Sequence, residues 1–231
     1  MKIFISLITS FLVIIMVFKF QTNNKQKLNQ KIKFSSETLY TDKKKILENV
    51  KQIILTGNHQ EISSLENELE NMSHIESAEV YFNVNGEIGL SYNEFEPVVR
   101  ICNSENQSYY LNSNCKKVPL SEEYTPDIIL FTGNTKDIQD HLMLNLAKKI
   151  NSDKFLKYQV SEVYIDELKE AFIIPVVGNH KIKIGSFDNI EHKIKKVMTF
   201  YDKIIPKYGW EKYSEINLEY QNQIICLRND R

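Results

Sequence analysis

The sequence has few of the residues, and none of the motifs, on which most enzymes and nucleic-acid-binding proteins depend. Only three of its 29 basic residues are Arg, its 30 acidic residues bring the formal charge to -1, and it has seven Gly and five Pro. Arg suits bidentate phosphate contacts, and nucleic-acid binding needs an excess of positive charge. No GxGxxG, GxxxxGK[ST], GxSxG, HExxH or CxxC string occurs. These absences argue against a nucleic-acid partner and against the usual nucleotide, hydrolase and zinc sites.

Cysteine is also scarce. Cys102, Cys115 and Cys226 lie 13 and 111 positions apart, which matches no zinc spacing. Cys102 and Cys115 can pair across a hairpin or serve as small apolar strand residues, and we prefer the second interpretation. The five histidines form no pattern with other metal-ligand residues on one helix face. We therefore expect no catalytic residue, no metal, no cofactor and no small-molecule substrate.

The most apolar part of the chain lies near its N-terminus. Sixteen uncharged residues, IFISLITSFLVIIMVF, stand between Lys2 and Lys19. As a helix they span roughly 24 Å, and the flanking lysine stems close most of the gap to a ~30 Å hydrocarbon core. The alternative is a cleaved signal peptide, but the next residues, KFQTNN, offer no A-x-A-like cleavage site. We expect a cytoplasmic tail (1–2), an uncleaved single-pass anchor (3–20) and a polar linker (21–30).

The segment after the linker has the pattern of a small α+β domain. It shows a short strand at 31–34, a helix between Thr41 and Gly57, a second helix at 62–72, and strands at 78–84 and 87–92. Asn85-Gly86 between the last two strands is the dipeptide that a type I′ hairpin turn prefers. We expect two helices to cover one face of a three-stranded sheet.

The remainder is predicted to be mostly strands with two helices. Strands are expected at 109–111, 128–131, 159–165, 171–177, 181–184, 216–220 and 223–228, and helices at 135–150 and 188–205. Because the chain ends on a strand, we expect that strand at a sheet edge. Trp210, with Tyr208 and Tyr213, is interpreted either as a partner anchor or as a cover for the end of the last helix.

Two charged runs are interpreted as solvent-facing helix surfaces. They are Glu61, Glu66, Glu68 and Glu70 in the second helix, and Lys193, Lys195 and Lys196 in the last.

Several strings, in order along the chain, resemble the FtsQ/DivIB cell-division family. Residues 75–101, IESAEVYFNVNGEIGLSYNEFEPVVRI, look like the end of that family's polypeptide-transport-associated (POTRA) domain. Further similarities are YYL at 109–111 with VPLS at 118–121, FTG at 131–133, IKIG at 182–185, the helix at 188–205 and INLEY at 216–220. The chain departs from the pattern at Asn112 and Cys115, where Asp and Gly are usual, at 93–95, and at Asn217, where Asp is usual.

The resemblance implies an α+β fold with an N-terminal transmembrane helix. A small βααββ POTRA-like domain (31–101) would follow, and then an FtsQ-type, β-rich domain with two flanking helices (102–231). It further implies a non-enzymatic, bitopic scaffold of the cytoplasmic (inner) membrane, concentrated at the division septum, with its body outside the cytoplasm. Lysines crowd the C-terminal flank of the apolar run, which by itself favours a cytoplasmic body; we follow the family topology.

The implied partners are FtsB/FtsL-type bitopic division proteins, with septal wall synthase components as further candidates. Such a scaffold would link early and late division proteins and regulate septal wall synthesis. Two other functions stay open: a membrane-anchored POTRA-type transport or chaperone accessory protein, and a membrane-tethered thiol enzyme. The transport alternative is the weaker match because the chain has no repeat of the first domain and no barrel-length series of strands.

In the resembled family the partner FtsB adds a strand to the edge formed by the last strand. By that resemblance Tyr220 matches the family's contact tyrosine. The receiving edge would consist of Gln223, Ile224, Ile225, Cys226 and Leu227. The alternative is that Ile224 and Leu227 belong to the core and that Tyr220 only covers the hairpin.

Overall fold

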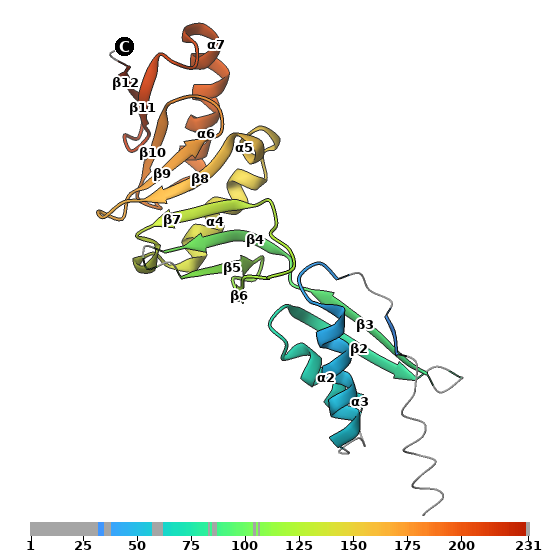
Figure 1. Ribbon diagram of the computed structural model, residues 1–231. Helices are drawn as coiled ribbons and strands as arrows, with labels where there is room; N and C mark the ends of the chain where they lie inside the picture. The colour runs from blue at the N-terminus through green and yellow to red at the C-terminus, as the bar shows by residue number, and fades with distance from the viewer. Residues whose placement is uncertain are drawn as a thin grey trace, which may run out of the picture. The chain divides into compact units, whose positions relative to one another are not determined.

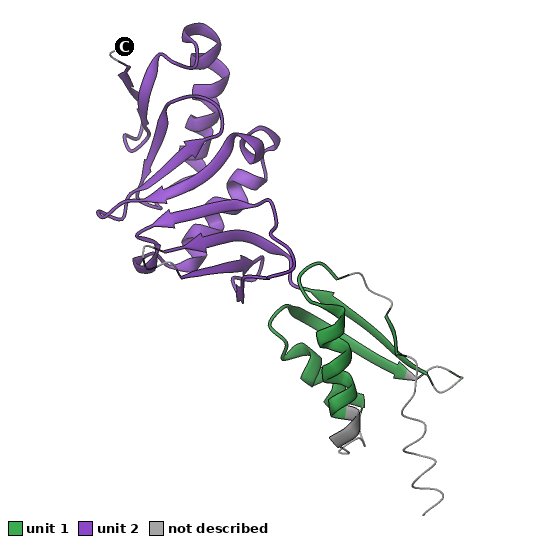
Figure 2. Ribbon diagram, in the orientation of Figure 1, with its two compact units in different colours: residues 1–94 green, residues 95–231 purple. Residues whose placement is uncertain are grey.

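The computed structural model describes residues 32–34, 38–56, 62–82, 84, 87–103, 105 and 107–229. The chain forms two compact units, divided between Glu94 and Phe95 (Figure 2). Each unit has its own sheet and its own hydrophobic core. Among the described residues no helix is long and apolar enough to cross a bilayer. The tail, anchor and linker expected at residues 1–30 lie outside the described residues.

Unit 1 has the element order strand, helix, helix, strand, strand, as the sequence predicts (Figure 1). Its elements are β1 (Ile32–Phe34), α2 (Lys43–Thr56), α3 (Ile62–Glu70), β2 (Ile75–Phe82) and β3 (Ile88–Glu94). The strands lie in the order β1-β3-β2, with β1 parallel and β2 antiparallel to β3. Ile46 and Val50 of α2 and Leu65 and Leu69 of α3 are buried in one cluster with Leu90. Their i, i+4 spacing turns both helices toward the sheet.

Unit 2 is built on a nine-stranded sheet in the order β12-β11-β10-β9-β8-β7-β4-β5-β6. Its strands are β4 (Pro97–Cys102), β5 (Ser108–Asn112), β6 (Lys117–Pro119), β7 (Ile129–Gly133), β8 (Val160–Ile165), β9 (Ala171–Pro175), β10 (Lys181–Gly185), β11 (Tyr213–Asn217) and β12 (Ile225–Arg228). The pairs β4–β7, β7–β8 and β10–β11 are parallel, and the others are antiparallel. The last strand of the chain therefore lies at one margin of the sheet.

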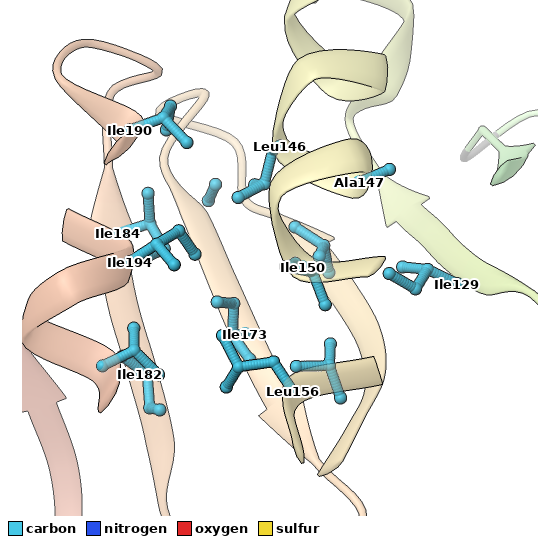
Figure 3. Packing of buried hydrophobic residues seen from close by; sticks show 14 of the residues in the cluster. Ile129, Leu146, Ala147, Ile150, Leu156, Ile173, Ile182, Ile184, Ile190 and Ile194 are labelled. Carbon is cyan, nitrogen blue, oxygen red and sulfur yellow. The ribbon is translucent and has the colours of Figure 1, made fainter. Parts of the chain in front are cut away.

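Helices cover one face of this sheet. They are the 3-10 turn η2 (Thr135–Asp137), α4 (Asp140–Asn151), α5 (Lys154–Gln159), α6 (Ile190–Thr199), the π-helical turn η3 (Phe200–Ile204) and α7 (Ile205–Tyr208). Figure 3 shows Ile150 of α4, Leu156 of α5 and Ile194 of α6 gathered over Ile173 and Ile182 of the sheet, and all five side chains are buried. The apolar faces of α4, α5 and α6 thus pack on the sheet in one hydrophobic core.

The structure places the boundary between the units earlier than the predicted domain junction after residue 101. The reason is that β4 pairs with β5 and β7, so it belongs to the large sheet. Sequence reasoning also missed β6 and the short helix α5. The Asp153 carboxylate caps α5, since its Oδ1 accepts hydrogen bonds from the N–H groups of Phe155 and Leu156 at 2.9 Å.

The expectation that both charged runs face solvent is wrong for Lys193 and Lys196, which are only 6% and 8% exposed. In the acidic run Glu68 and Glu70 are exposed, as expected, and Glu61 lies outside the described residues. Glu66 is half-buried, and both Glu66 and Glu70 accept hydrogen bonds from main-chain N–H groups of β2. The buried lysine ammonium groups donate to main-chain carbonyls of neighbouring segments, which satisfies their polar ends away from bulk water.

Candidate functional site

The terminal strand β12 is the outermost strand of the large sheet. Among the described residues it pairs with β11 alone, in antiparallel register with Ile216 opposite Cys226 and Asn217 opposite Ile225. The strand has four residues, and one irregularity in the register lies on the β11 side, between Tyr213 and Glu215. One side of β12 is thus open to another strand.

Hydrogen bonding at the end of β12 shows which main-chain groups face that open side. The Asn229 N–H donates to the Lys212 carbonyl oxygen at 3.0 Å. Along a strand, the main-chain groups of successive residues point alternately toward the paired strand and away from it. The groups of Ile225 and Leu227 therefore point toward β11, and those of Cys226 and the N–H of Arg228 point to the open side. The Arg228 carbonyl oxygen accepts a hydrogen bond from the Ser214 hydroxyl of β11 at 3.5 Å. A partner strand would therefore pair chiefly with Cys226.

The side chains of β12 divide between two faces of the sheet. Ile224 and Cys226 are half-buried against the main core. Ile225 and Leu227 alternate with them, and Leu227 is 53% exposed. The alternative interpretation from the sequence thus holds for Ile224, which packs on the core, but not for Leu227.

Tyr220 and Gln223 lie in the turn that joins β11 to β12, and both are exposed. Three main-chain carbonyls of this turn accept hydrogen bonds from α6. The Lys196 Nζ donates to the Leu218 oxygen at 3.2 Å and to the Tyr220 oxygen. The His192 Nε2 lies 2.8 Å from the Gln221 oxygen.

The opposite side of the same turn is held by ion pairs. The Lys183 Nζ lies 2.8 Å from a Glu170 oxygen and 2.9 Å from a Glu219 oxygen. Hydrogen bonds to Glu170 and Glu219 raise the pKa of Lys183, and the hydrogen bond from Lys183 lowers the pKa of Glu219. The Asn217 Oδ1 accepts a hydrogen bond from the Glu219 N–H at 2.9 Å. The turn that leads into β12 is therefore fixed from both faces of the sheet.

The edge strand β2 of unit 1, in contrast, has part of its main chain bonded to a helix. In unit 1, β2 lies at the margin of its sheet, and α3 reaches over it. The Ala78 N–H donates to Glu70 Oε1 at 3.1 Å, and the Val80 N–H donates to Glu66 Oε1 at 2.9 Å. Two main-chain donors of β2 are thus occupied. At the far margin of the large sheet, β6 has only three residues and ends in Pro119, which has no N–H.

The three cysteines are free thiols. Cys102 lies opposite Ser108 at one end of the β4–β5 pair, whereas Cys115 follows the other end of β5. The pairing considered from the sequence is therefore not formed. Burial raises the pKa of Cys226 and of Cys115, which keeps both thiols protonated near neutral pH.

A polar hollow of about 330 Å³ lies at the N-terminal end of α4. Inside it the Tyr109 hydroxyl donates to Asp140 Oδ1 at 2.6 Å, and the Lys117 Nζ lies 3.0 Å from Asp140 Oδ2. Burial and the hydrogen bond to Asp140 raise the pKa of Tyr109 to about 12. The other two charged residues of the hollow, Lys136 and Asp137, pair with Glu105 and Lys169 beside it. Among the described residues no three His, Cys, Asp or Glu side chains gather to hold a metal ion.

Trp210 packs inward. Its ring centroid lies 6.3 Å from His180 and 5.8 Å from Tyr201, both of which are buried. Of the two interpretations considered from the sequence, the structure supports a cover for the end of the helix.

Comparison with protein families identifies the large sheet. The family model described as FtsQ/DivIB, C-terminal related, matches residues 96–227, from the start of β4 into β12. The chain belongs to the FtsQ/DivIB family. FtsQ/DivIB proteins are cell-division proteins and act as scaffolds rather than enzymes. A search of curated proteins finds no match to this FtsQ/DivIB chain. The matched region contains Tyr220 and the whole predicted receiving edge from Gln223 to Leu227.

Proposed function

We propose that this FtsQ/DivIB protein is a bitopic division scaffold that binds an FtsB/FtsL-type partner by β-strand addition to β12. Such a scaffold would link early and late division proteins and regulate septal wall synthesis. The observation that carries the proposal is the open margin of β12, where the main-chain groups of Cys226 point away from β11. An extended segment can continue the hydrogen-bond ladder there.

Specificity would come from side chains next to the added strand. Leu227 and Ile225 offer apolar surface on one face of β12, and Tyr220 is 49% exposed in the turn before it. Side chains of neighbouring strands that lie side by side contribute about 0.2–1 kcal/mol per pair. A partner segment with apolar residues at alternate positions would therefore be favoured over a polar one.

The proposal includes the membrane topology expected from the sequence. Residues 3–20 would anchor the chain, and both units, the first as a POTRA-like domain, would lie outside the cytoplasm at the septum. A protease-protection assay on a C-terminal tag tests this part. Digestion of the tag in spheroplasts supports it, whereas protection of the tag contradicts it.

The thiol-enzyme alternative has less support. A nucleophilic cysteine needs its thiolate form, but burial raises the pKa of Cys226, the thiol at the proposed edge. Its role in the proposal is therefore that of a strand residue with an outward N–H.

Capture of the partner from detergent extracts tests strand addition. Cys226→Pro removes the outward N–H, and a proline is tolerated at an edge strand whose N–H faces solvent. We expect at least a tenfold loss of captured FtsB/FtsL-type protein. Cys226→Ala is the matched control, because it removes the thiol but keeps the N–H, and it should bind normally. Normal capture by Cys226→Pro would contradict strand addition, and loss of function in Cys226→Ala would favour the thiol enzyme.

A further inference from the structure

Two side chains of α6 hold the turn that joins β11 to β12. The Lys196 ammonium donates to the carbonyl oxygens of Leu218 and Tyr220, and His192 contacts that of Gln221. Because a carbonyl oxygen can only accept, the His192 Nε2 must carry the proton in this contact. The turn thus has three of its carbonyls bound to one helix.

Lys196 is an unusual choice for this position. Its side chain is buried, and burial lowers the pKa of its ammonium group. Within the described part of the chain no carboxylate pairs with it. A buried cation without a counter-ion costs free energy, and an apolar side chain of similar size would avoid that cost. What Lys196 adds is a set of hydrogen-bond donors that reach two carbonyls of one turn.

The neighbouring buried lysine serves another segment. The Lys193 Nζ donates to the Ser186 carbonyl oxygen at 2.8 Å and lies 3.4 Å from the Ser186 hydroxyl, in the loop between β10 and α6. Lys193 and Lys196 are thus both buried on the same helix, but their hydrogen bonds go to different loops. The Lys193 charge also acts on Glu219 of the β11–β12 turn. Lys193→Met is therefore the matched control, because it removes a charge near the turn without removing a hydrogen bond to it.

We infer that Lys196 and His192 are positioning residues that hold the β11–β12 turn, so that β12 stays ordered as the edge strand offered to a partner. The consequence for partner binding rests on the proposed function. The ordering of β12 does not, since it can be measured on the chain alone. Without these contacts the turn would lose its attachment to α6, and β12 would be held by its pairing with β11 and by the packing of Ile224 and Cys226 on the core.

Hydrogen exchange of the full-length protein in detergent, with and without the captured partner, tests this inference. In Lys196→Met we expect the amides of Ile225 and Leu227, which point toward β11, to exchange about tenfold faster, the size expected when about one hydrogen bond's stabilisation is lost. In Lys193→Met the same amides should exchange at the wild-type rate. The melting temperature should fall little in Lys196→Met, because the uncompensated buried charge is also removed.

A second pair of variants keeps the test decisive if Lys196→Met does not fold. His192→Ala should speed exchange in β12, and His192→Gln, whose amide N–H can still donate to the Gln221 oxygen, should restore much of the protection. Unchanged exchange in both Lys196→Met and His192→Ala would overturn the inference, as would equal acceleration in Lys193→Met. Faster exchange with undiminished partner capture would support the positioning role but count against β12 as the partner site.

Discussion

Two edge strands of this protein, β2 in unit 1 and β12 in unit 2, differ in whether side chains of a helix bond to their main chain. Over β2, the α3 carboxylates of Glu66 and Glu70 accept hydrogen bonds from main-chain N–H groups. Beside β12, side chains of α6 bond to the preceding turn, and within the described part of the chain the main-chain groups of Cys226 pair with no second strand. An uncovered edge invites association with other chains, and proteins usually block it. This difference between the two edge strands supports the proposal that β12 receives a partner strand.

The largest expected effect comes from uncovering β2. The double variant Glu66→Ala/Glu70→Ala leaves the N–H groups of Ala78 and Val80 without their carboxylate partners. Two lost hydrogen bonds to charged groups predict a destabilisation of unit 1 by about 2–4 kcal/mol, measured by urea unfolding. Self-association should also rise with protein concentration in sedimentation velocity runs. Glu68→Ala, in the same helix and exposed, is the control; an equal loss there would show that the edge contacts do not matter.

A glycine at the end of β10 tests how closely the turn before β12 is packed. Gly185 has φ +69°, and a Cβ there would lie 2.6 Å from Glu219 Oε1. Gly185→Ala should destabilise unit 2 by about 1–2 kcal/mol from the left-handed backbone alone, and more if Glu219 is displaced from Lys183. Gly185→Ala in a Glu219→Ala background, where the close contact with the Glu219 carboxylate is absent, measures the backbone part. Equal losses of unfolding free energy in the two backgrounds would show that Glu219 adjusts without cost.

The Lys183–Glu219 pair predicts a dependence of stability on pH. The hydrogen bond from Lys183 lowers the pKa of Glu219 below its ordinary value of 4.5. A carboxylate with a lowered pKa in the folded state stabilises the fold above its unfolded pKa, and this contribution is lost as the pH falls through the folded value. The free energy of unfolding of unit 2 should therefore decrease from near pH 4.5 downward. In Glu219→Gln this decrease should be smaller, whereas the exposed Glu167→Gln variant should follow the wild type.

The sequence predicted the features that depend on hydrophobic period and turn residues. The βααββ order of unit 1 and the position of the last strand were read from the spacing of apolar residues and from Asn85-Gly86. The assignment of β4 to the large sheet could not be read in this way, since periodicity shows that a segment is a strand but not which strands it pairs with.

The contacts that distinguish the two edge strands could not be predicted from the sequence either. Glu66 and Glu70 each follow a buried leucine of the α3 apolar stripe, and their partners are Val80 and Ala78, 14 and 8 residues further along the chain. Lys196 bonds to carbonyls more than 20 residues away. A charged residue on an amphipathic helix looks the same in sequence whether it faces water or a main-chain group. One local signal existed, because Lys193 and Lys196 each precede a buried residue of the stripe formed by Ile194 and Val197.

The smallest effect on stability, and the sharpest test of which side chains a partner meets, is expected at Leu227. Its side chain is 53% exposed, so Leu227→Ser should change the free energy of unfolding by no more than about 0.5 kcal/mol. If a partner strand lies beside β12, the same change removes apolar contact from the interface and should weaken capture of the FtsB/FtsL-type protein several-fold. Leu168→Ser, at a 78% exposed apolar residue away from the edge, should leave capture unchanged. Equal capture by all three proteins would mean that the partner meets a different surface.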